Sequence, residues 1–103
     1  MSKLSEAEIE KNLAALPEWS ELGGAIQRTY QFAGFPQAMR FAEQVAQLAE
    51  AAQHHPDILI RYNKVTLSLS THDAGGITQK DFDLAAKIDA LPQAKPAKPA
   101  RKA

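Results

Sequence analysis

The sequence of 103 residues contains no cysteine. Disulfide bonds, thiolate nucleophiles and cysteine-ligated zinc are therefore excluded as sources of stability or chemistry. No apolar stretch approaches the roughly 20 residues that cross a bilayer, and no apolar run follows the first residues. We therefore expect neither a membrane span nor a signal peptide, and we expect a cytoplasmic location.

A surplus of charge is also missing, because 12 Lys and Arg residues balance 12 Asp and Glu residues. A chain without net charge has no overall electrostatic attraction to nucleic acid or to an anionic membrane. Four of the basic residues lie near the C-terminus, at Lys95, Lys98, Arg101 and Lys102. We expect one domain over residues 1–91. Residues 92–103 repeat Lys-Pro-Ala with nothing to bury, which predicts a disordered, solubilising basic tail rather than a nucleic-acid arm.

Three segments have the apolar spacing of helices. The first and the last begin with the pattern of a capping box, at Ser5 and at Thr78, and Asp81 is expected to be the acid of the second box. The longest helix begins near Pro36, a residue suited to the first turn, and is expected to run to about Gln53.

Two hairpins are expected between these helices. Residues 18–32 contain a Gly-Gly turn followed by alternating apolar and polar residues, and Arg28 is the one polar residue on the apolar face. In residues 58–70 the turn is predicted at Asn63-Lys64, because Asn tolerates positive φ. The order helix, two strands, helix, two strands, helix predicts an α+β fold, in which three helices pack on one face of a four-stranded antiparallel sheet.

All three histidines, His54, His55 and His72, lie in one short part of the chain. If Tyr62 and Val65 flank the second turn, continued pairing places His55 opposite His72, about 5 Å away at Cα. His54 is the neighbouring residue at the end of the long helix. We therefore expect the three imidazoles to converge at one end of the sheet.

Converging imidazoles suit a reaction that needs an acid and a base together, because an ordinary imidazole pKa near 6.5 allows both roles at neutral pH. A surface or capping role is the ordinary alternative for any single histidine. Metal binding is a further alternative, but neighbouring helical residues point about 100° apart, so His54 and His55 are poorly placed to bind one ion. Glu50 lies one helical turn before His54, and it either contacts that ring or is a solvated helix residue. We expect no metal and no cofactor.

A longer pattern surrounds the histidines. It consists of Glu50, His54, His55, Pro56, Tyr62, His72 and Asp81, with the neighbouring stretches 62–65, 69–73 and 76–78. Together with Trp19 and residues 32–41, this pattern resembles the signature of the pterin-4a-carbinolamine dehydratases over roughly residues 5–90. The basic tail lies outside the resemblance.

The resemblance implies the α+β fold predicted above, and homodimers or homotetramers built through sheet edges and the long helix. It also implies a reaction, the loss of water from 4a-hydroxytetrahydropterin to give quinonoid dihydropterin. This reaction recycles the pterin of tetrahydrobiopterin type after an aromatic amino acid hydroxylase has used it. It requires protonation of the C4a hydroxyl and removal of the N5 proton, and it needs no metal or redox cofactor.

Residue roles follow from the same resemblance. His54 and His72 would be the acid and the base, in an order that the sequence leaves open, and His55 would bind and orient the pterin. The family's further pterin contacts fall on Pro56, Thr71, Asp73 and Ala74, with supporting positions at Glu50 and Asp81. Some relatives have cysteine where Ala74 stands, which leaves the imidazole chemistry intact.

A non-catalytic binding module is the alternative function. Some family members also act as dimerisation cofactors for a transcription factor through the exposed side of the long helix. In this sequence that side contains Arg40, Glu43, Gln44 and Gln47, which also fit any solvated helix. A third interpretation is an assembly or folding aid that has lost its activity, and the complete set of histidines argues against it.

Overall fold

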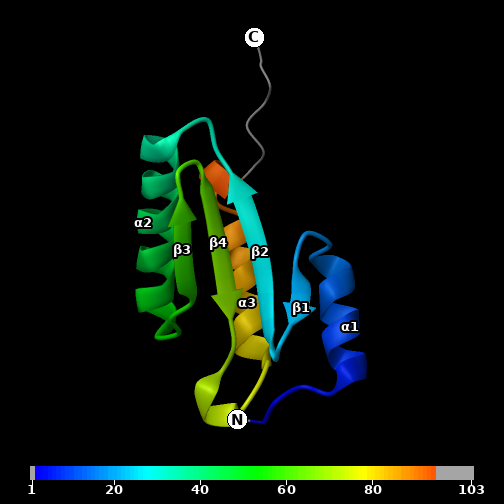
Figure 1. The fold of residues 1–103 in the computed structure, drawn as a ribbon. Helices are drawn as coiled ribbons and strands as arrows, with labels where there is room; N and C mark the ends of the chain where they lie inside the picture. Colours follow the sequence, from blue (N-terminus) through cyan, green and yellow to red (C-terminus); the bar gives the residue numbers. More distant parts are fainter. Residues whose placement is uncertain (1, 95–103) are drawn as a thin grey trace.

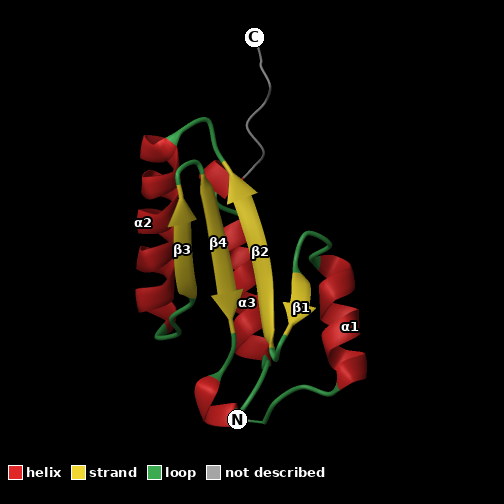
Figure 2. Ribbon diagram, viewed as in Figure 1, coloured by secondary structure: helices red, strands yellow, loops and turns green. Residues whose placement is uncertain are grey.

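The computed structural model describes residues 2–94. Their elements are, in order, α1 (Glu6–Ala15), β1 (Ser20–Leu22), β2 (Ala25–Gln31), α2 (Phe35–Ala52), β3 (Asp57–Arg61), β4 (Lys64–Leu69), the 3₁₀ helix η1 (His72–Ala74), α3 (Gln79–Asp89) and the 3₁₀ helix η2 (Pro92–Ala94). The strands form one antiparallel sheet in the order β1-β2-β4-β3, and α2 and α3 lie against one face of it (Figures 1 and 2). The predicted α+β fold and the order of its elements are confirmed.

The helix starts form as their sequences predict. In α1 the hydroxyl of Ser5 accepts a hydrogen bond from the backbone of Glu8, and the Ser5 backbone N–H donates to the Glu8 carboxylate in return. That backbone N–H bond lowers the pKa of Glu8 below its ordinary value. Thr78 and Asp81 form the second capping box at the start of α3. Both boxes satisfy backbone N–H groups that a helix start leaves without partners.

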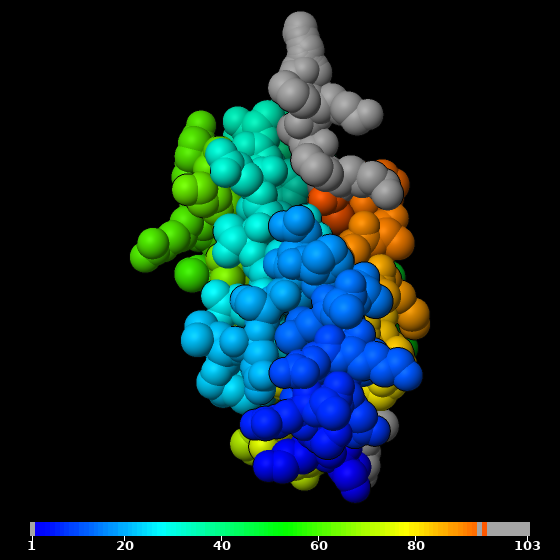
Figure 3. Space-filling view, turned by 90° about the vertical axis from the view of Figure 1, so that its right-hand side faces the viewer, coloured from blue at the N-terminus to red at the C-terminus, as the bar shows by residue number. Residues whose placement is uncertain are grey.

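The core lies between the sheet and the helices. Alternate residues of β2 and β4 point into it, and the apolar stripes of α2 and α3 cover them. The helix α1 lies along the side of the molecule, next to α3, and contributes Ile9 to the same core (Figure 3). The fully buried side chains include Ile26, Phe41, Val45, Val65, Leu67, Leu69, Leu84 and Ile88.

The cationic side chain of Arg28 lies on the inner face of the sheet, where the carboxylate of Asp89 neutralises its charge. Asp89, at the end of α3, forms an ion pair with Arg28 at 2.9 Å, and it also accepts hydrogen bonds from the Trp19 indole and the Tyr30 hydroxyl. The Arg28 guanidinium lies 4.2 Å from the centre of the Tyr30 ring. Burial and the neighbouring Asp89 carboxylate raise the pKa of Tyr30 well above its ordinary value. The polar side chain on the apolar face is therefore part of a paired cluster.

The predicted turn of the second hairpin is wrong. Arg61 pairs with Lys64, so the turn consists of Tyr62 and Asn63, and Tyr62 has a φ of 51°. The Asn63 side chain donates to the Phe32 carbonyl, and the Phe32 N–H donates to the Asn63 carbonyl. These two bonds tie the turn to the end of β2, a contact that the sequence pattern of the hairpin does not contain.

The change of turn moves the register by two residues. Ile58 faces Leu67, where the sequence predicted Leu69. Because side chains alternate with a period of two, the same residues still point into the core. The predicted pairing of His55 with His72 is nevertheless wrong, because β3 begins only at Asp57 and the shifted register does not bring these two residues opposite each other.

Beyond α3 the described chain continues for one short helical turn. Pro92–Ala94 form η2, and the side chain of Ala94 is buried in the core. These three residues were expected to belong to the tail, and the remainder of the predicted tail, residues 95–103, lies outside the described residues. In the described chain we find no helix with the length and apolarity that a membrane crossing requires.

Candidate active site

The end of α2 positions two of the three histidines. Gln53 adopts a left-handed conformation with a φ of 53°, and the N–H of His54 donates to the Ala49 carbonyl at 3.1 Å. This arrangement is a common way to end a helix, and it turns the chain sharply. As a result His54 is buried, whereas the next residue, His55, is exposed.

A fully buried carboxylate holds the ring of His54. The Nε2 atom of His54 lies 2.5 Å from Oδ1 of Asp81, and Oδ2 of Asp81 accepts hydrogen bonds from Thr71 and from the backbone of Thr78. Because the carboxylate accepts, the proton of a neutral His54 ring lies on Nε2, which leaves Nδ1 as a hydrogen-bond acceptor. Asp81 is therefore the capping acid of α3, as predicted, and also the partner of His54.

The segment after β4 carries the third histidine. Thr71 forms an isolated bridge with Gly76, and its hydroxyl lies 2.7 Å from that of Thr78. Between the two ends of this loop, His72 begins η1, and Gly75 closes it with a φ of 75°, a conformation that glycine adopts without strain. The imidazole of His72 is exposed, and it shares one depression with His54 and His55, which follow α2.

Glu50 contacts the ring of His55, and neither alternative drawn from the sequence included that contact. Its Oε1 atom lies 3.0 Å from Nε2 of His55, and both side chains are largely exposed. The contact with His54 that helical spacing suggested is not formed, because His54 points inward to Asp81. The two adjacent histidines thus have separate carboxylate partners.

A shallow depression of about 230 Å³ brings the histidines together. It is lined by His54, His55 and His72 and by Gln53, Ser70, Thr71, Asp73 and Lys80. Among the other residues that the resemblance assigned to the site, Glu50 and Asp81 contact the histidines from outside this lining, and Pro56 and Ala74 do not line it. The wrong strand register did not change the outcome, since the loop at residues 71–76 carries His72 to the same end of the sheet.

Gln53, Ser70 and Lys80 line the depression without having been identified from the sequence. Lys80 offered a usable signal, because it stands immediately before Asp81 and on the same helical start. Across residues 2–94, no group of three or more His, Asp and Glu side chains is arranged to hold a metal ion. The groups that converge here are proton donors and acceptors.

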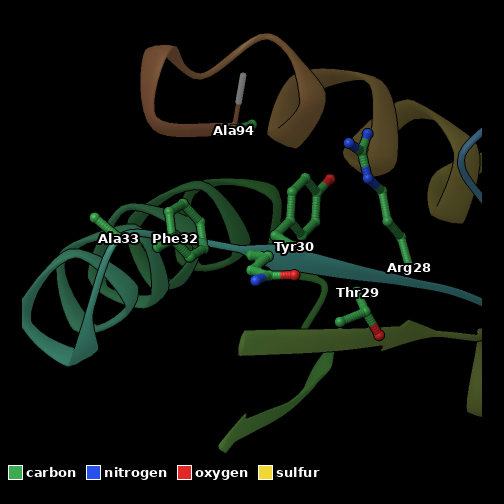
Figure 4. Close-up of a pocket in the computed structure, with 7 residues that line it drawn as sticks. Arg28, Thr29, Tyr30, Phe32, Ala33 and Ala94 are labelled. Atoms are coloured by element: carbon green, nitrogen blue, oxygen red, sulfur yellow. The ribbon is translucent and has the colours of Figure 1, made fainter. Parts of the chain in front are cut away.

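A separate depression of about 340 Å³ lies beside β2, away from the histidines. Figure 4 shows Arg28 and Tyr30 pointing from β2 toward α3, with Ala94 facing them across the opening. Both polar groups are bound to Asp89, and the raised pKa of Tyr30 makes its hydroxyl a poor proton donor at neutral pH. The histidine depression at the other end of the sheet is therefore the candidate active site.

Comparison with known proteins identifies the family of this chain. The family model described as pterin 4 alpha carbinolamine dehydratase matches residues 2–91, nearly the whole described chain. The chain belongs to the pterin 4 alpha carbinolamine dehydratase family. A protein of Roseiflexus sp. (strain RS-1) is 59% identical over 90 residues, which cover 87% of this chain and 97% of the relative. Its name assigns it provisionally to pterin-4-alpha-carbinolamine dehydratase, as does that of a relative from Picosynechococcus sp. (strain ATCC 27264 / PCC 7002 / PR-6), which is 52% identical over 87% of this chain and 98% of its own.

Solved structures share the fold of this dehydratase family member. A protein from Brucella melitensis, described as a transcriptional coactivator/pterin dehydratase, superposes with a TM-score of 0.85 and 35% identity, covering 91% of this chain and all of its own. A pterin dehydratase-like protein, described as a RuBisCO assembly factor in the alpha-carboxysome, has a TM-score of 0.63 over 78% of this chain and 93% of its own. At 24% identity this second likeness concerns the fold alone.

Proposed function

We propose that the protein is a 4a-hydroxytetrahydropterin dehydratase, a hydro-lyase that releases water and quinonoid dihydropterin by histidine acid/base catalysis. The observation that carries the proposal is the pairing of buried His54 with Asp81 beside exposed His72 in one open depression. Membership of the dehydratase family supports it. The pterin would come from an aromatic amino acid hydroxylase, and recycling of tetrahydrobiopterin in the cytoplasm is the proposed context.

The reaction needs one proton removed and one supplied. We assign His54 as the base, since its Nδ1 atom has the free lone pair and the Asp81 carboxylate stabilises the imidazolium that forms. As Nδ1 takes the N5 proton, the electron pair of that N–H bond forms the C4a=N5 double bond. The C4a–O bond breaks, and protonated His72 donates to the departing hydroxyl, which leaves as water.

Binding roles complete the proposed site. His55, oriented by Glu50, would bind and orient the pterin from the solvent side, and Thr71 and Asp73 line the same depression. Pro56 and Ala74 remain proposed contacts for a pterin that extends past the depression. Every step is a proton transfer, so the proposal requires no metal and no cofactor.

Dehydration of chemically generated 4a-hydroxytetrahydropterin, followed by absorbance with EDTA present, tests the proposal. We expect His54→Ala and His72→Ala each to lower kcat by about 10²-fold or more, the range for a positioned acid or base. Gln47→Ala, an exposed change on α2, serves as the control and should leave kcat unchanged. Full turnover in both histidine variants, or loss of wild-type turnover on addition of EDTA, would contradict the mechanism.

We further propose that the protein forms a homodimer or homotetramer. Five of the six large apolar side chains that are exposed lie in α2, β3 or the turn after β3, namely Phe35, Met39, Ile58, Leu59 and Tyr62. The neighbouring elements α2 and β3 form one side of the molecule (Figure 1), and β3 is an edge strand whose outer backbone groups have no partner strand among residues 2–94. A second copy would cover both the apolar side chains and the edge.

A protein-binding role is the second candidate, favoured by the double description of the Brucella relative. The partner surface would be the polar side of α2 around Arg40, Glu43 and Gln47, all of which are exposed. The double variant Arg40→Ala/Glu43→Ala distinguishes a protein-binding role from catalysis. Loss of a captured partner with dehydration retained would demonstrate a second role, separate from catalysis.

A further inference from the structure

A second cavity adjoins the histidine depression. It has a volume of about 240 Å³ and is lined by Ala52, His54, Lys80, Asp83, Leu84 and Lys87. His54 and Lys80 line both spaces, so they form the boundary between them. A ligand whose reacting ring lies in the first space can therefore reach the second without leaving the protein surface.

The second cavity lies between the end of α2 and one side of α3, from its first turn at Lys80 to its last turn at Lys87. Lys80, Asp83 and Lys87 are all in α3, and seven residues of helix amount to about two turns, so the two lysines lie on one side about 10 Å apart along the axis. Leu84, on the same side, supplies a buried apolar floor.

The charges of this cavity are predominantly positive. Neither Lys80 nor Lys87 forms a salt bridge with any carboxylate among residues 2–94, although both line the cavity. The single carboxylate of the lining, Asp83, accepts a hydrogen bond from Gln79 at 3.0 Å. Two unpaired cations on one side of a cavity attract an anion, and more strongly at low salt.

We infer that this cavity binds an anionic side chain of the pterin, so that the protein binds a pterin with a phosphorylated or carboxylated substituent more tightly than one of tetrahydrobiopterin type, whose side chain is uncharged. The inference rests on the proposed function, because it places the ring of the pterin in the histidine depression. Lys87 would contact the anion, and Lys80 would lie where the substituent leaves the ring. Lys87 lines only the second cavity, so it can be changed without touching the histidines.

Binding of stable pterins tests the inference. The probes are 7,8-dihydroneopterin, its monophosphate and dihydrofolate, titrated against the wild-type protein at low salt. We expect a Kd for the preferred anionic probe about five- to twentyfold below that of 7,8-dihydroneopterin, the gain from one or two exposed ion pairs. A preference for the monophosphate indicates a phosphate side chain, and a preference for dihydrofolate indicates a glutamate-type carboxylate.

Variants of the cavity make the test specific. Lys87→Met should reduce the preference by about fivefold while leaving the Kd of 7,8-dihydroneopterin unchanged. Lys87→Arg should restore the preference, and Asp83→Asn should increase it, since it removes the one repulsive carboxylate. Lys64→Met removes an equal charge in β4, at the turn end of the sheet far from the histidines, and should change nothing.

The outcomes separate this inference from the proposed function. If the wild type dehydrates a carbinolamine with an uncharged side chain but binds all three probes equally, the inference alone is wrong. An anion preference that survives Lys87→Met also overturns it. If no probe binds and no dehydration occurs, the inference and the dehydratase proposal are both wrong.

Discussion

Asp81 illustrates how much a single residue does in this protein. Its carboxylate caps α3, accepts from Thr71 and holds the ring of His54, all with no exposure to solvent. A buried carboxylate is costly unless its oxygens are hydrogen-bonded, and here both oxygens have partners. The residue that starts the last helix therefore also sets the orientation of the proposed base.

Replacing this carboxylate should weaken catalysis more than binding. We expect Asp81→Asn to lower kcat about 10- to 100-fold, with a smaller change in KM, because Asn retains the shape but not the charge that stabilises the imidazolium. The ¹⁵N chemical shifts of the His54 ring should also change, since the amide no longer selects the Nε2–H form. Kinetics and NMR on the same preparation provide the measurement.

The control separates positioning from capping. Thr78→Ala removes the hydroxyl that caps α3, at a cost of about 1 kcal/mol in the free energy of unfolding, and leaves the carboxylate on His54. Equal losses of kcat in the two variants, both fully folded, would show that Asp81 acts only through the helix start.

At the scale of elements, the turn between β3 and β4 stores a small amount of strain. Tyr62 has a φ of 51°, in the left-handed region where a side chain costs about 1 kcal/mol, and its ring is 70% exposed. We expect Tyr62→Gly to raise the free energy of unfolding of the protomer by up to about 1 kcal/mol, because little burial within the protomer is lost. Urea denaturation with an unchanged slope would measure it.

At the neighbouring position, Asn63, we expect glycine to have the opposite effect on the free energy of unfolding. Asn63 has no positive φ, and its side chain donates to the Phe32 carbonyl. Asn63→Gly should therefore lower the free energy of unfolding. Stabilisation at residue 63 and not at residue 62 would favour the turn predicted from the sequence over the one in the structure.

The Asp89 cluster joins two elements and a loop residue, because it connects α3 with β2 and with Trp19, the residue before β1. Tyr30→Phe removes a hydroxyl that donates to a carboxylate, so we expect a loss of about 1.5 kcal/mol in the free energy of unfolding at neutral pH. Thermal or urea denaturation of the variant and the wild type measures the difference.

The loss of unfolding free energy caused by Tyr30→Phe should become smaller at high pH. The pKa of Tyr30 is raised by folding, so the folded protein keeps a proton that the unfolded chain releases above its ordinary value of 10.0. The stabilisation is therefore fully present below pH 10 and declines as the pH rises beyond it. The difference in the free energy of unfolding between the wild type and Tyr30→Phe should therefore decrease above pH 10. Tyr62→Phe, which removes an exposed hydroxyl, is the matched control, and a gap that stays constant would refute the linkage.

For the whole molecule, we propose that the exposed apolar side formed by α2 and β3 determines the association state. A monomer of this size buries a limited core, so covering a further apolar side would add stability. We expect Leu59→Lys, on the edge strand β3, to convert the homo-oligomer to monomer, as measured by size-exclusion chromatography with light scattering. Leu22→Lys makes the same change on the opposite edge strand, where Leu22 is 65% exposed, and should leave the mass unchanged. A monomeric wild type would contradict the proposed assembly.

Local patterns in the sequence determined most of the elements. The capping boxes at Ser5 and Thr78, the Gly-Gly turn and the apolar stripes of the helices depend on residues within about one or two turns of each other, so their spacing is visible in the chain. The convergence of the three histidines at one end of the sheet was also predicted, although the pairing of His55 with His72 from which it was argued is wrong.

Only the tertiary structure decided the contacts between residues distant in the chain. The turn between β3 and β4 is bonded through Asn63 to Phe32, 31 residues away, and the partner of His54 is 27 residues away. Asp89 meets Arg28 and Trp19 across 61 and 70 residues. Such contacts arise when packing brings side chains together and burial makes an unpaired polar group costly, and no local spacing records that requirement. Local sequence therefore determined where the helices and strands form, whereas packing selected the partner of each buried polar group.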